Sequence, residues 1–294
     1  MNRQKIVPSL WFDREAKEAA EFYVSVFDDS RINQVAAMHD TPSGDADLVD
    51  FQIMGYDFTA ISAGPLFKIN PSISFHARCR TPEEVDRLWS KLSEGGTAMM
   101  ELGEYPFSRR YGWIQDRFGV SWQVIHTEGD FKQRVMPALM FVGAVCGRAE
   151  EAIGFYASIF REAKAEVLSR YADGEEPDKA GTVKYAQLFL FGQEFGAMDS
   201  ALKHEFGFNE AVSFAVNCKD QREIDYFWDK LSAVPGAEQC GWVKDKFGVS
   251  WQIVPANMGE LIGRNPARTT PVMLRMKKII IADLELAGRA DVGE

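Results

Sequence analysis

Apolar and polar residues recur at two different spacings along the first part of the chain, and these spacings predict helices and strands in turn. Ala19, Phe22, Tyr23 and Val26 recur every three or four positions, which predicts a helix over 14–27 with one apolar face. Alternation instead predicts strands near 6–12, 31–39, 47–54 and 57–63. The predicted order is one strand, one helix and three strands.

A second round of the same pattern follows at once. Thr81 as N-cap, Pro82 at the first helical position and Glu84 at the capping-box position predict a helix over 82–94. Strands are expected near 72–79 and 97–101 and as a hairpin over 111–125. The unit β-α-β-β-β therefore occurs twice.

The second half of the chain repeats the first. Phe22 and Phe155 are 133 positions apart, and Trp89 and Trp228 are 139 apart. Later, GWIQDRFGVSWQV at 112–124 matches GWVKDKFGVSWQI at 241–253 at nine of thirteen positions, with an offset of 129. The change of offset indicates a ten-residue shortening before the final hairpin. Internal duplication of this kind decides the architecture.

Four βαβββ modules in a row, with these repeated stretches, resemble the vicinal-oxygen-chelate superfamily of glyoxalase I, extradiol dioxygenases and the bleomycin- and fosfomycin-resistance proteins. LWFDREAKEAAEFYVSVF, GPLFKINPSISF and EVDRLWSKLSEGG, with their second-half partners, are similar to the PhnB-like group, often labelled 3-demethylubiquinone-9 3-methyltransferase-like. The resemblance implies an α+β fold in which the modules form two tandem glyoxalase-like cup domains, with a helical C-terminal tail.

The domain boundaries follow from the repeat. We place the first domain at 1–128, a linker at 129–134, the second domain at 135–256 and the tail at 257–294. In the tail, Met273, Met276, Ile279, Ile280 and Leu284 give an apolar stripe across a predicted pair of helices. That stripe favours covering a sheet edge or a neighbouring subunit over lying on a membrane.

The composition limits the partners. A formal charge of -10 argues against nucleic acid and anionic membrane surfaces. We find no apolar run of about 18 residues and no signal-peptide pattern at the start, so we expect a cytoplasmic protein. The four cysteines form no CxxC pair, which argues against a disulfide or zinc framework.

Alternation along the strands also predicts which residues line the cups. The first strand offers either Pro8, Leu10 and Phe12 or Ser9 and Trp11, and the resemblance selects the first set. The residues expected to contact a ligand are Leu10, Phe12, Ser72, Ser74, His76, Ser121 and Gln123 in the first copy and Leu139, Phe141, Ser213, Ser250 and Gln252 in the second. Asn70 and Asn209 either close a turn or reach a ligand at the mouth, and the turn is favoured.

The metal positions of the superfamily depart from its pattern here. Metal-dependent members place His, Glu or Gln at the start of the first strand, the start of the fifth and the end of the eighth. This chain has Pro8, Ser72 and Gln123 there, and Pro137, Ala211 and Gln252 in the second copy. Because one neutral Gln does not hold a divalent ion, we predict no metal.

No other cofactor is predicted. A methyl donor such as S-adenosylmethionine usually rests on a glycine-rich strand-to-helix turn, and no such stretch occurs. His76 is the only histidine on an expected cup face, and a hydrogen-bonded or pocket-lining role is favoured over a general base because Ala215 stands in the matching position. Asp116 and Asp245 are expected to cap the tight turns of DRFG and DKFG.

Three functions stay open at this point. The first is a protein that binds a small, partly apolar metabolite in one or both cups without a metal. The second is an enzyme of the superfamily, with lyase, isomerase, transferase or dioxygenase-type chemistry at an atypical site. In the third, one copy is degenerate and serves as a dimerisation partner, so that the chain is an intramolecular pseudo-dimer or also forms a homodimer.

Overall fold

The computed structural model describes residues 4–41 and 44–289. Residues 1–3, 42–43 and 290–294, which include the start of the predicted first domain and the end of the predicted tail, lie outside the described residues. The chain divides into two compact units, one of residues 8–212 and one of residues 1–7 with 213–294.

Residues 8–212 contain three modules with the predicted order of elements. The first is β1 (Ile6–Phe12, which starts in the other unit), α1 (Ala16–Val26), β2 (Arg31–Thr41), β3 (Gly44–Ile53) and β4 (Tyr56–Ser62). The second is β5 (Ile73–Cys79), α2 (Pro82–Leu92), β6 (Thr97–Tyr105), β7 (Ser108–Gln115) and β8 (Ser121–His126). The third is β9 (Val135–Phe141), the short turn η1 (Gly143–Val145), α3 (Ala149–Ile159), β10 (Lys164–Arg170), β11 (Val183–Leu190) and β12 (Gln193–Asp199).

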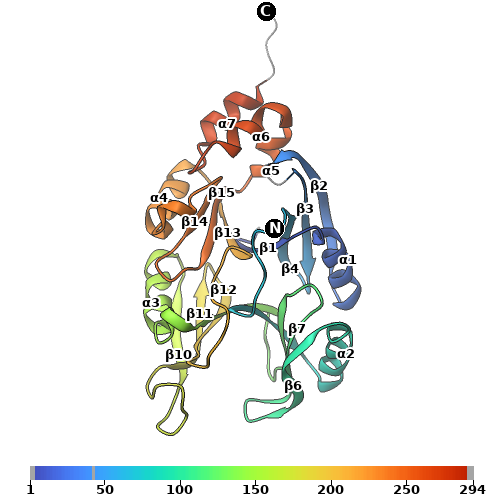
Figure 1. Cartoon of the computed structure of the whole chain (residues 1–294), viewed down its shortest axis with the longest axis vertical. Coiled ribbons are helices and arrows are strands. Elements are labelled where there is room, and N and C mark those ends of the chain that lie inside the picture. The colour runs from blue at the N-terminus through green and yellow to red at the C-terminus, as the bar shows by residue number, and fades with distance from the viewer. Residues whose placement is uncertain (1–3, 42–43, 290–294) are drawn as a thin grey trace, which may run out of the picture. The chain divides into compact units, whose positions relative to one another are not determined.

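The second and third modules form one eight-stranded sheet, in the order β10-β11-β12-β9-β5-β8-β7-β6. Its centre is the antiparallel pair β5 and β9, in which Ser74 lies opposite Ala138 and His76 opposite Met136. Helix α2 packs on β5, β7 and β8, and α3 on β10, β11 and β12, with both helices outside the strands (Figure 1). This sheet therefore joins the second module of the first copy to the first module of the second copy.

Aromatic side chains fill the core under α1. The helix buries Tyr23, whose ring lies 5.4 Å from that of Trp122 on β8 and 6.3 Å from that of Phe51 on β3. Phe75 on β5 lies 5.5 Å from Trp122 and 5.1 Å from Phe58 on β4. Rings of this size supply most of the apolar area that a domain of this size buries.

Asp116 organises the turn between β7 and β8. Its Oδ1 accepts hydrogen bonds from the amides of Phe118 and Val120, and its Oδ2 accepts from the Tyr23 hydroxyl and the Trp122 indole. Burial raises the pKa of this carboxyl to about 6. The predicted turn-capping role is confirmed, and the same side chain also ties the turn to α1.

The other unit contains the fourth module, with β13 (Val212–Cys218, mostly in this unit), α4 (Gln221–Leu231), the short turn η2 (Pro235–Ala237), β14 (Trp242–Lys244) and β15 (Ser250–Pro255). In the described part of this module only two strands follow the helix, because the shortening removes the counterpart of β6. Asp245 repeats the arrangement of Asp116, accepting from the amides of Phe247 and Val249 and from the Trp251 indole.

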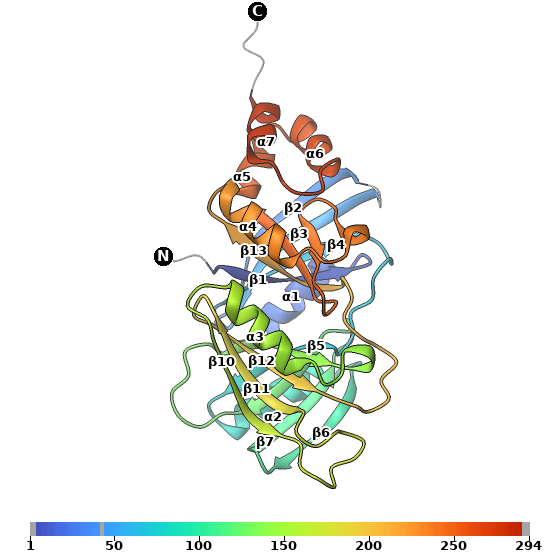
Figure 2. The same cartoon turned by 90° about the vertical axis from the view of Figure 1, so that its left-hand side faces the viewer.

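The tail forms three short helices rather than the predicted pair: α5 (Met258–Gly263), α6 (Pro266–Leu274) and α7 (Ile281–Gly288). Figure 2 shows these three helices next to one another near the C-terminal end of the chain. Leu261, Met273, Ile279 and Leu284 form a small core of their own. The carbonyl groups of Met276 and Lys277 accept hydrogen bonds from the amides of Cys240 and Gly241, just before β14. The tail thus covers the edge left by the missing strand, as one of the sequence alternatives proposed. Among the described residues no helix is long and apolar enough to cross a bilayer.

Candidate functional site

The eight-stranded sheet has one face toward the helices and one face away from them, and Gly112 tells them apart. A Cβ at Gly112 would lie 2.4 Å from the ring of Trp89 on α2, so this residue faces the helix. Its neighbours Tyr111 and Trp113 therefore face away from it. Trp113 pairs with Gln123 on β8, which pairs with His76 on β5, so all three share the helix-free face.

The polar residues on this face include two hydrogen-bonded groups. The Tyr111 hydroxyl donates to Oε1 of Gln123 over 2.7 Å, and Nε2 of Gln123 donates to Oγ of Ser74 over 2.8 Å. Alongside, the Trp113 indole donates to Oγ of Ser121 over 2.7 Å. We call the residues of this face the polar cluster: Ser74, His76, Tyr111, Trp113, Ser121 and Gln123.

His76 is the member of the cluster with an unused polar atom. It is 7% exposed, its ring stacks on that of Tyr185 at 6.2 Å, and its Nε2 is buried with no hydrogen-bond partner among the described residues. Burial, followed by the nearby charge of Arg78, lowers the pKa of His76 to about 3. The ring is therefore neutral near pH 7, and its free nitrogen can exchange one hydrogen bond with a ligand.

Leu139 and Phe141 lie on the other face of the same sheet. Leu139 pairs with Ile73 on β5, next to Ser74, and so points toward the helix side, while Phe141, two residues along, packs its ring 5.1 Å from Phe208. The face expected for these two residues is reversed.

The same reversal holds for Leu10 and Phe12 on β1. Leu10 pairs with Ala60 and Phe12 with Ser62 on β4, which places both on the face of Phe58, where α1 packs. The ring of Phe12 lies 6.4 Å from that of Phe118 in the core. The predicted alternation along this strand is present, but the predicted face is wrong: Ser9 and Trp11, and not Leu10 and Phe12, face away from the helix.

Asn70 and Asn209 bind each other's loops. Oδ1 of Asn70 accepts from the Ser72 amide, and Oδ1 of Asn209 accepts from the Ala211 amide, each over 2.9 Å. Their side-chain nitrogens cross over: Asn70 donates to the Gly207 carbonyl over 3.0 Å and Asn209 to the Lys68 carbonyl over 2.9 Å. Both amides therefore close turns, and Ser72 uses its carbonyl to accept from the amide of Met140.

The second copy keeps part of the polar cluster. Nε2 of Gln252 donates to Oγ of Ser213 over 3.0 Å, and Ser213 pairs with Ser250 in the strand register. The positions that match His76 and Tyr111 hold Ala215 and Cys240. The Gln–Ser hydrogen bond is thus common to both copies, and the imidazole and phenol belong to the first.

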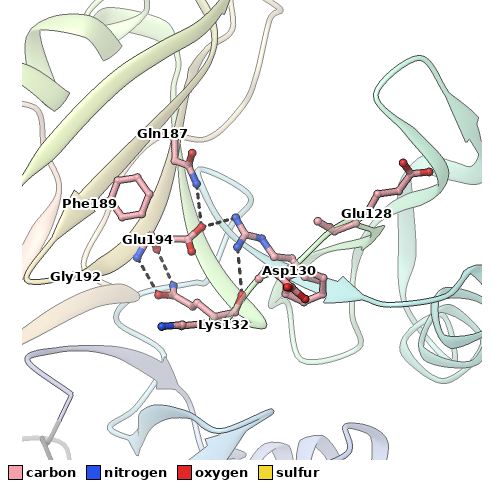
Figure 3. Close-up of a pocket in the computed structure, with 11 residues that line it drawn as sticks. Glu128, Asp130, Lys132, Gln187, Phe189, Gly192 and Glu194 are labelled. Atoms are coloured by element: carbon pink, nitrogen blue, oxygen red, sulfur yellow. Dashed lines mark hydrogen bonds and ion pairs between the residues drawn. The ribbon is translucent and has the colours of Figure 1, made fainter.

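A pocket opens at the edge of the helix-free face, under the segment that joins β8 to β9. It has a volume of about 530 Å³, and we call it the linker pocket. Figure 3 shows Gln187 pointing toward the carboxylate of Glu194, with Lys132 on the linker side. Its lining residues are Arg78, Thr127, Glu128, Asp130, Phe131, Lys132, Gln133, Gln187, Phe189, Gly192 and Glu194.

None of the residues that line the linker pocket is among those expected from the sequence to contact a ligand. Arg78 follows Ser74 and His76 at two-residue spacing on β5, so alternation alone could have added it to the expected cup face. The remaining walls come from a linker without periodicity and from strands of the other copy. No local pattern predicts that they meet.

The residues at the superfamily's metal positions do not fit a metal. The Gln123 amide is bonded at both ends, by Tyr111 and Ser74, and proline and serine stand at the other two positions. Among the described residues no three His, Cys, Asp or Glu side chains come together as a metal group.

Both halves of the chain match one known protein family. A family model described as 3-demethylubiquinone-9 3-methyltransferase matches residues 4–125 and again residues 133–254. No curated protein sequence matches at a significant level.

Three solved structures are similar to this chain. The "putative 3-demethylubiquinone-9 3-methyltransferase, PhnB protein" of Bacillus cereus is 35% identical, with 42% of this chain and 100% of that chain covered at a TM-score of 0.40. Glyoxalase I of Zea mays is 13% identical over 86% of this chain and 92% of that chain at a TM-score of 0.54. A putative dioxygenase of Bacillus subtilis is 12% identical over 91% and 94% at a TM-score of 0.51. The last two likenesses concern the fold.

Proposed function

Because the chain belongs to the family described as 3-demethylubiquinone-9 3-methyltransferase and carries it in two tandem copies, we propose that it binds a small, partly apolar metabolite at the polar cluster of the eight-stranded sheet. The glyoxalase-like fold is shared by proteins of different activity, so the family alone does not assign chemistry. The proposal rests on the side chains of the cluster.

One observation carries the proposal: a buried imidazole nitrogen without a partner stands beside a hydrogen-bonded Tyr–Gln–Ser chain. A buried polar atom that lacks a partner costs about 1–3 kcal/mol, which a ligand that supplies a hydrogen bond recovers. The rings of Tyr185 and Trp113 beside it offer apolar contact. Such a mixture of aromatic walls and a few fixed polar groups is typical of small-molecule sites.

The proposal is tested by thermal-shift and calorimetric titration with a panel of aromatic and hydrophobic metabolites. The variant Gln123→Leu should lose at least tenfold in affinity for any non-zwitterionic compound of the panel that binds, because the amide that orients the cluster is gone. The matched variant Gln252→Leu, in the copy without His76 and Tyr111, should leave the affinity unchanged. No binding across the panel, or equal losses in both variants, would contradict the proposal.

Catalysis on the bound compound is the alternative, and the neutral His76 ring is the observation that favours it. A base of such low pKa is weak, but it is the one histidine of the cluster. Conversion of a panel compound, detected by mass spectrometry and abolished in His76→Gln while binding is retained, would replace simple binding by an enzymatic function.

A further inference from the structure

The linker pocket contains an ion pair with little exposure to solvent. Nη2 of Arg78 lies 2.7 Å from Oε2 of Glu194, and the side chains are 11% and 17% exposed. Removing two charges from water costs several kcal/mol for each ion, and their attraction recovers that cost only with good geometry. Such a pair is weak evidence for a stabilising role, so its retention in a pocket wall calls for another explanation.

The internal duplication shows whether the structural contact of Arg78 with the backbone needs a positive charge. Nη1 of Arg78 donates to the Gln133 carbonyl over 3.3 Å. The equivalent residues of the repeat are Asn217, in the second copy, and Gln4, in the first, and the Asn217 side-chain amide donates to the Gln4 carbonyl over 3.0 Å. A neutral amide therefore makes the same backbone contact. The positive charge of Arg78 is not needed for that contact, and its presence is specific to this pocket.

Glu194 is held as firmly as Arg78. Its Oε2 accepts from Nε2 of Gln187 over 2.9 Å, and its backbone exchanges two hydrogen bonds with the side chain of Gln133, of 2.8 and 2.9 Å (Figure 3). Both charges are thus fixed in position before any ligand arrives. Preorganised groups of this kind lower the entropic cost of binding.

The remaining walls carry both signs of charge and two aromatic rings. Lys132 adds a cation, and Glu128 and Asp130 add anions. Phe131 lies under the guanidinium of Arg80 at 5.3 Å, and Phe189 forms part of the lining from β11. An anion alone would meet three carboxylates here, and a cation alone would meet Arg78 and Lys132. A ligand that carries both charges meets an opposite charge at each end.

We propose that the linker pocket binds a small zwitterion with an apolar side group, its carboxylate at Arg78 and its ammonium at Glu194. Arginine presents paired donors that match a carboxylate, and the ligand's two charges replace the Arg78–Glu194 contact with two new ones. A volume of about 530 Å³ is sufficient for a compound of amino-acid size. The inference uses other residues than the polar cluster, so it can fail or hold independently of the proposed function.

Isothermal titration with three probes of the same ring tests the charge requirement: L-phenylalanine, 3-phenylpropanoate and 2-phenylethylamine. We expect L-phenylalanine to bind at least tenfold more tightly than the other two. Binding of 3-phenylpropanoate or 2-phenylethylamine as tight as that of L-phenylalanine, or no binding of L-phenylalanine at millimolar concentration, would overturn the proposal.

Variants test the residues. Arg78→Asn, which copies the other repeat and keeps the backbone contact, should lower the affinity for L-phenylalanine at least tenfold, and so should Glu194→Gln, in case the first variant folds poorly. Arg110→Asn, which removes an ion pair with Asp86 outside the pocket, is the matched control and should bind as the unmodified protein does. Unchanged affinity in a folded Arg78→Asn or Glu194→Gln protein would place the zwitterion elsewhere and reject the site. The titrations with Gln123→Leu keep this result separate from the polar cluster, because that variant should retain L-phenylalanine binding.

Discussion

The two copies share a scaffold and differ in what they place upon it. Asp116 and Asp245 each accept hydrogen bonds from two amides of their own turn and from the indole of the following Trp. Gln123 and Gln252 each donate to the equivalent serine of their own copy. His76 and Tyr111 of the first copy are replaced by Ala215 and Cys240 in the second. The shared groups maintain the strands, so the difference identifies which residues are available for function.

If the aspartates are the common scaffold, their loss should have the largest effect of any substitution considered. Asp116→Ala would leave three buried donors and one partly buried donor without an acceptor, and we expect the free energy of unfolding to fall by about 3–5 kcal/mol. Asp245→Ala should destabilise its own unit to a similar extent. Urea denaturation followed by tryptophan fluorescence measures both, and a loss under about 1 kcal/mol in either variant would show that the copies do not share this support.

In the second copy the tail packs beside β14, in the place that β6 takes beside β7 in the first copy. Ile279 is fully buried between the tail and this edge, so Ile279→Ala should cost about 2–4 kcal/mol. Hydrogen exchange should increase at Cys240 and Gly241, whose amides bond to the tail, and should stay unchanged on β6 and β7. Unchanged exchange at Cys240 would mean that the tail does not hold this edge.

His76 makes the pH response specific to the first copy. The unfolded chain takes up a proton on this ring near pH 6.5, whereas the folded protein does so only near pH 3, so the folded state holds fewer protons between these values. The contribution of His76 to stability should therefore fall as the pH drops through this window, by roughly 2 kcal/mol at pH 5 relative to pH above 7. In His76→Gln that part of the pH dependence should disappear. Denaturation curves at pH 5 and pH 7.5 provide the measurement, and equal slopes in both proteins would contradict the assignment.

The glutamines should give the smallest difference. Gln123→Leu removes the hydrogen-bond partner of both Tyr111 and Ser74, with an expected cost of about 1–3 kcal/mol. Gln252→Leu removes the hydrogen bond to Ser213, and we expect a cost of about 1 kcal/mol. Thermal unfolding of the two variants side by side resolves the order. A larger loss of stability in Gln252→Leu than in Gln123→Leu would contradict this prediction.

Local patterns predicted the modules well. The N-cap at Thr81, the helix that presents Tyr23 and the turn at Asp116 all follow from residues close together in sequence, and each is confirmed. The match of both halves to one family model confirms the duplication. Short-range periodicity and capping are the strongest signals that a single sequence carries.

These local patterns could not predict which modules pair to form one sheet. On one side β5 pairs with β8 of its own copy, and on the other side it pairs with β9 of the second copy. Which strand takes that second place depends on long-range packing, and repeats of one sequence offer similar surfaces to every partner. The face of β1 and β9 was misassigned for a related reason. A strand such as VMPALMF is buried on both sides, so alternation offers two sets without a polar face to choose between them.

The reciprocal hydrogen bonds of Asn70 and Asn209 allow the sequences of the two copies to change independently. Equivalent residues of the two copies make equivalent bonds to each other's loops, which is the geometry of a two-fold contact between identical chains. In an assembly of identical chains, one altered codon would change both halves of that contact at once. Here each asparagine is encoded separately, so one side can vary while the other still holds, and the copies are free to acquire different chemistry without separating.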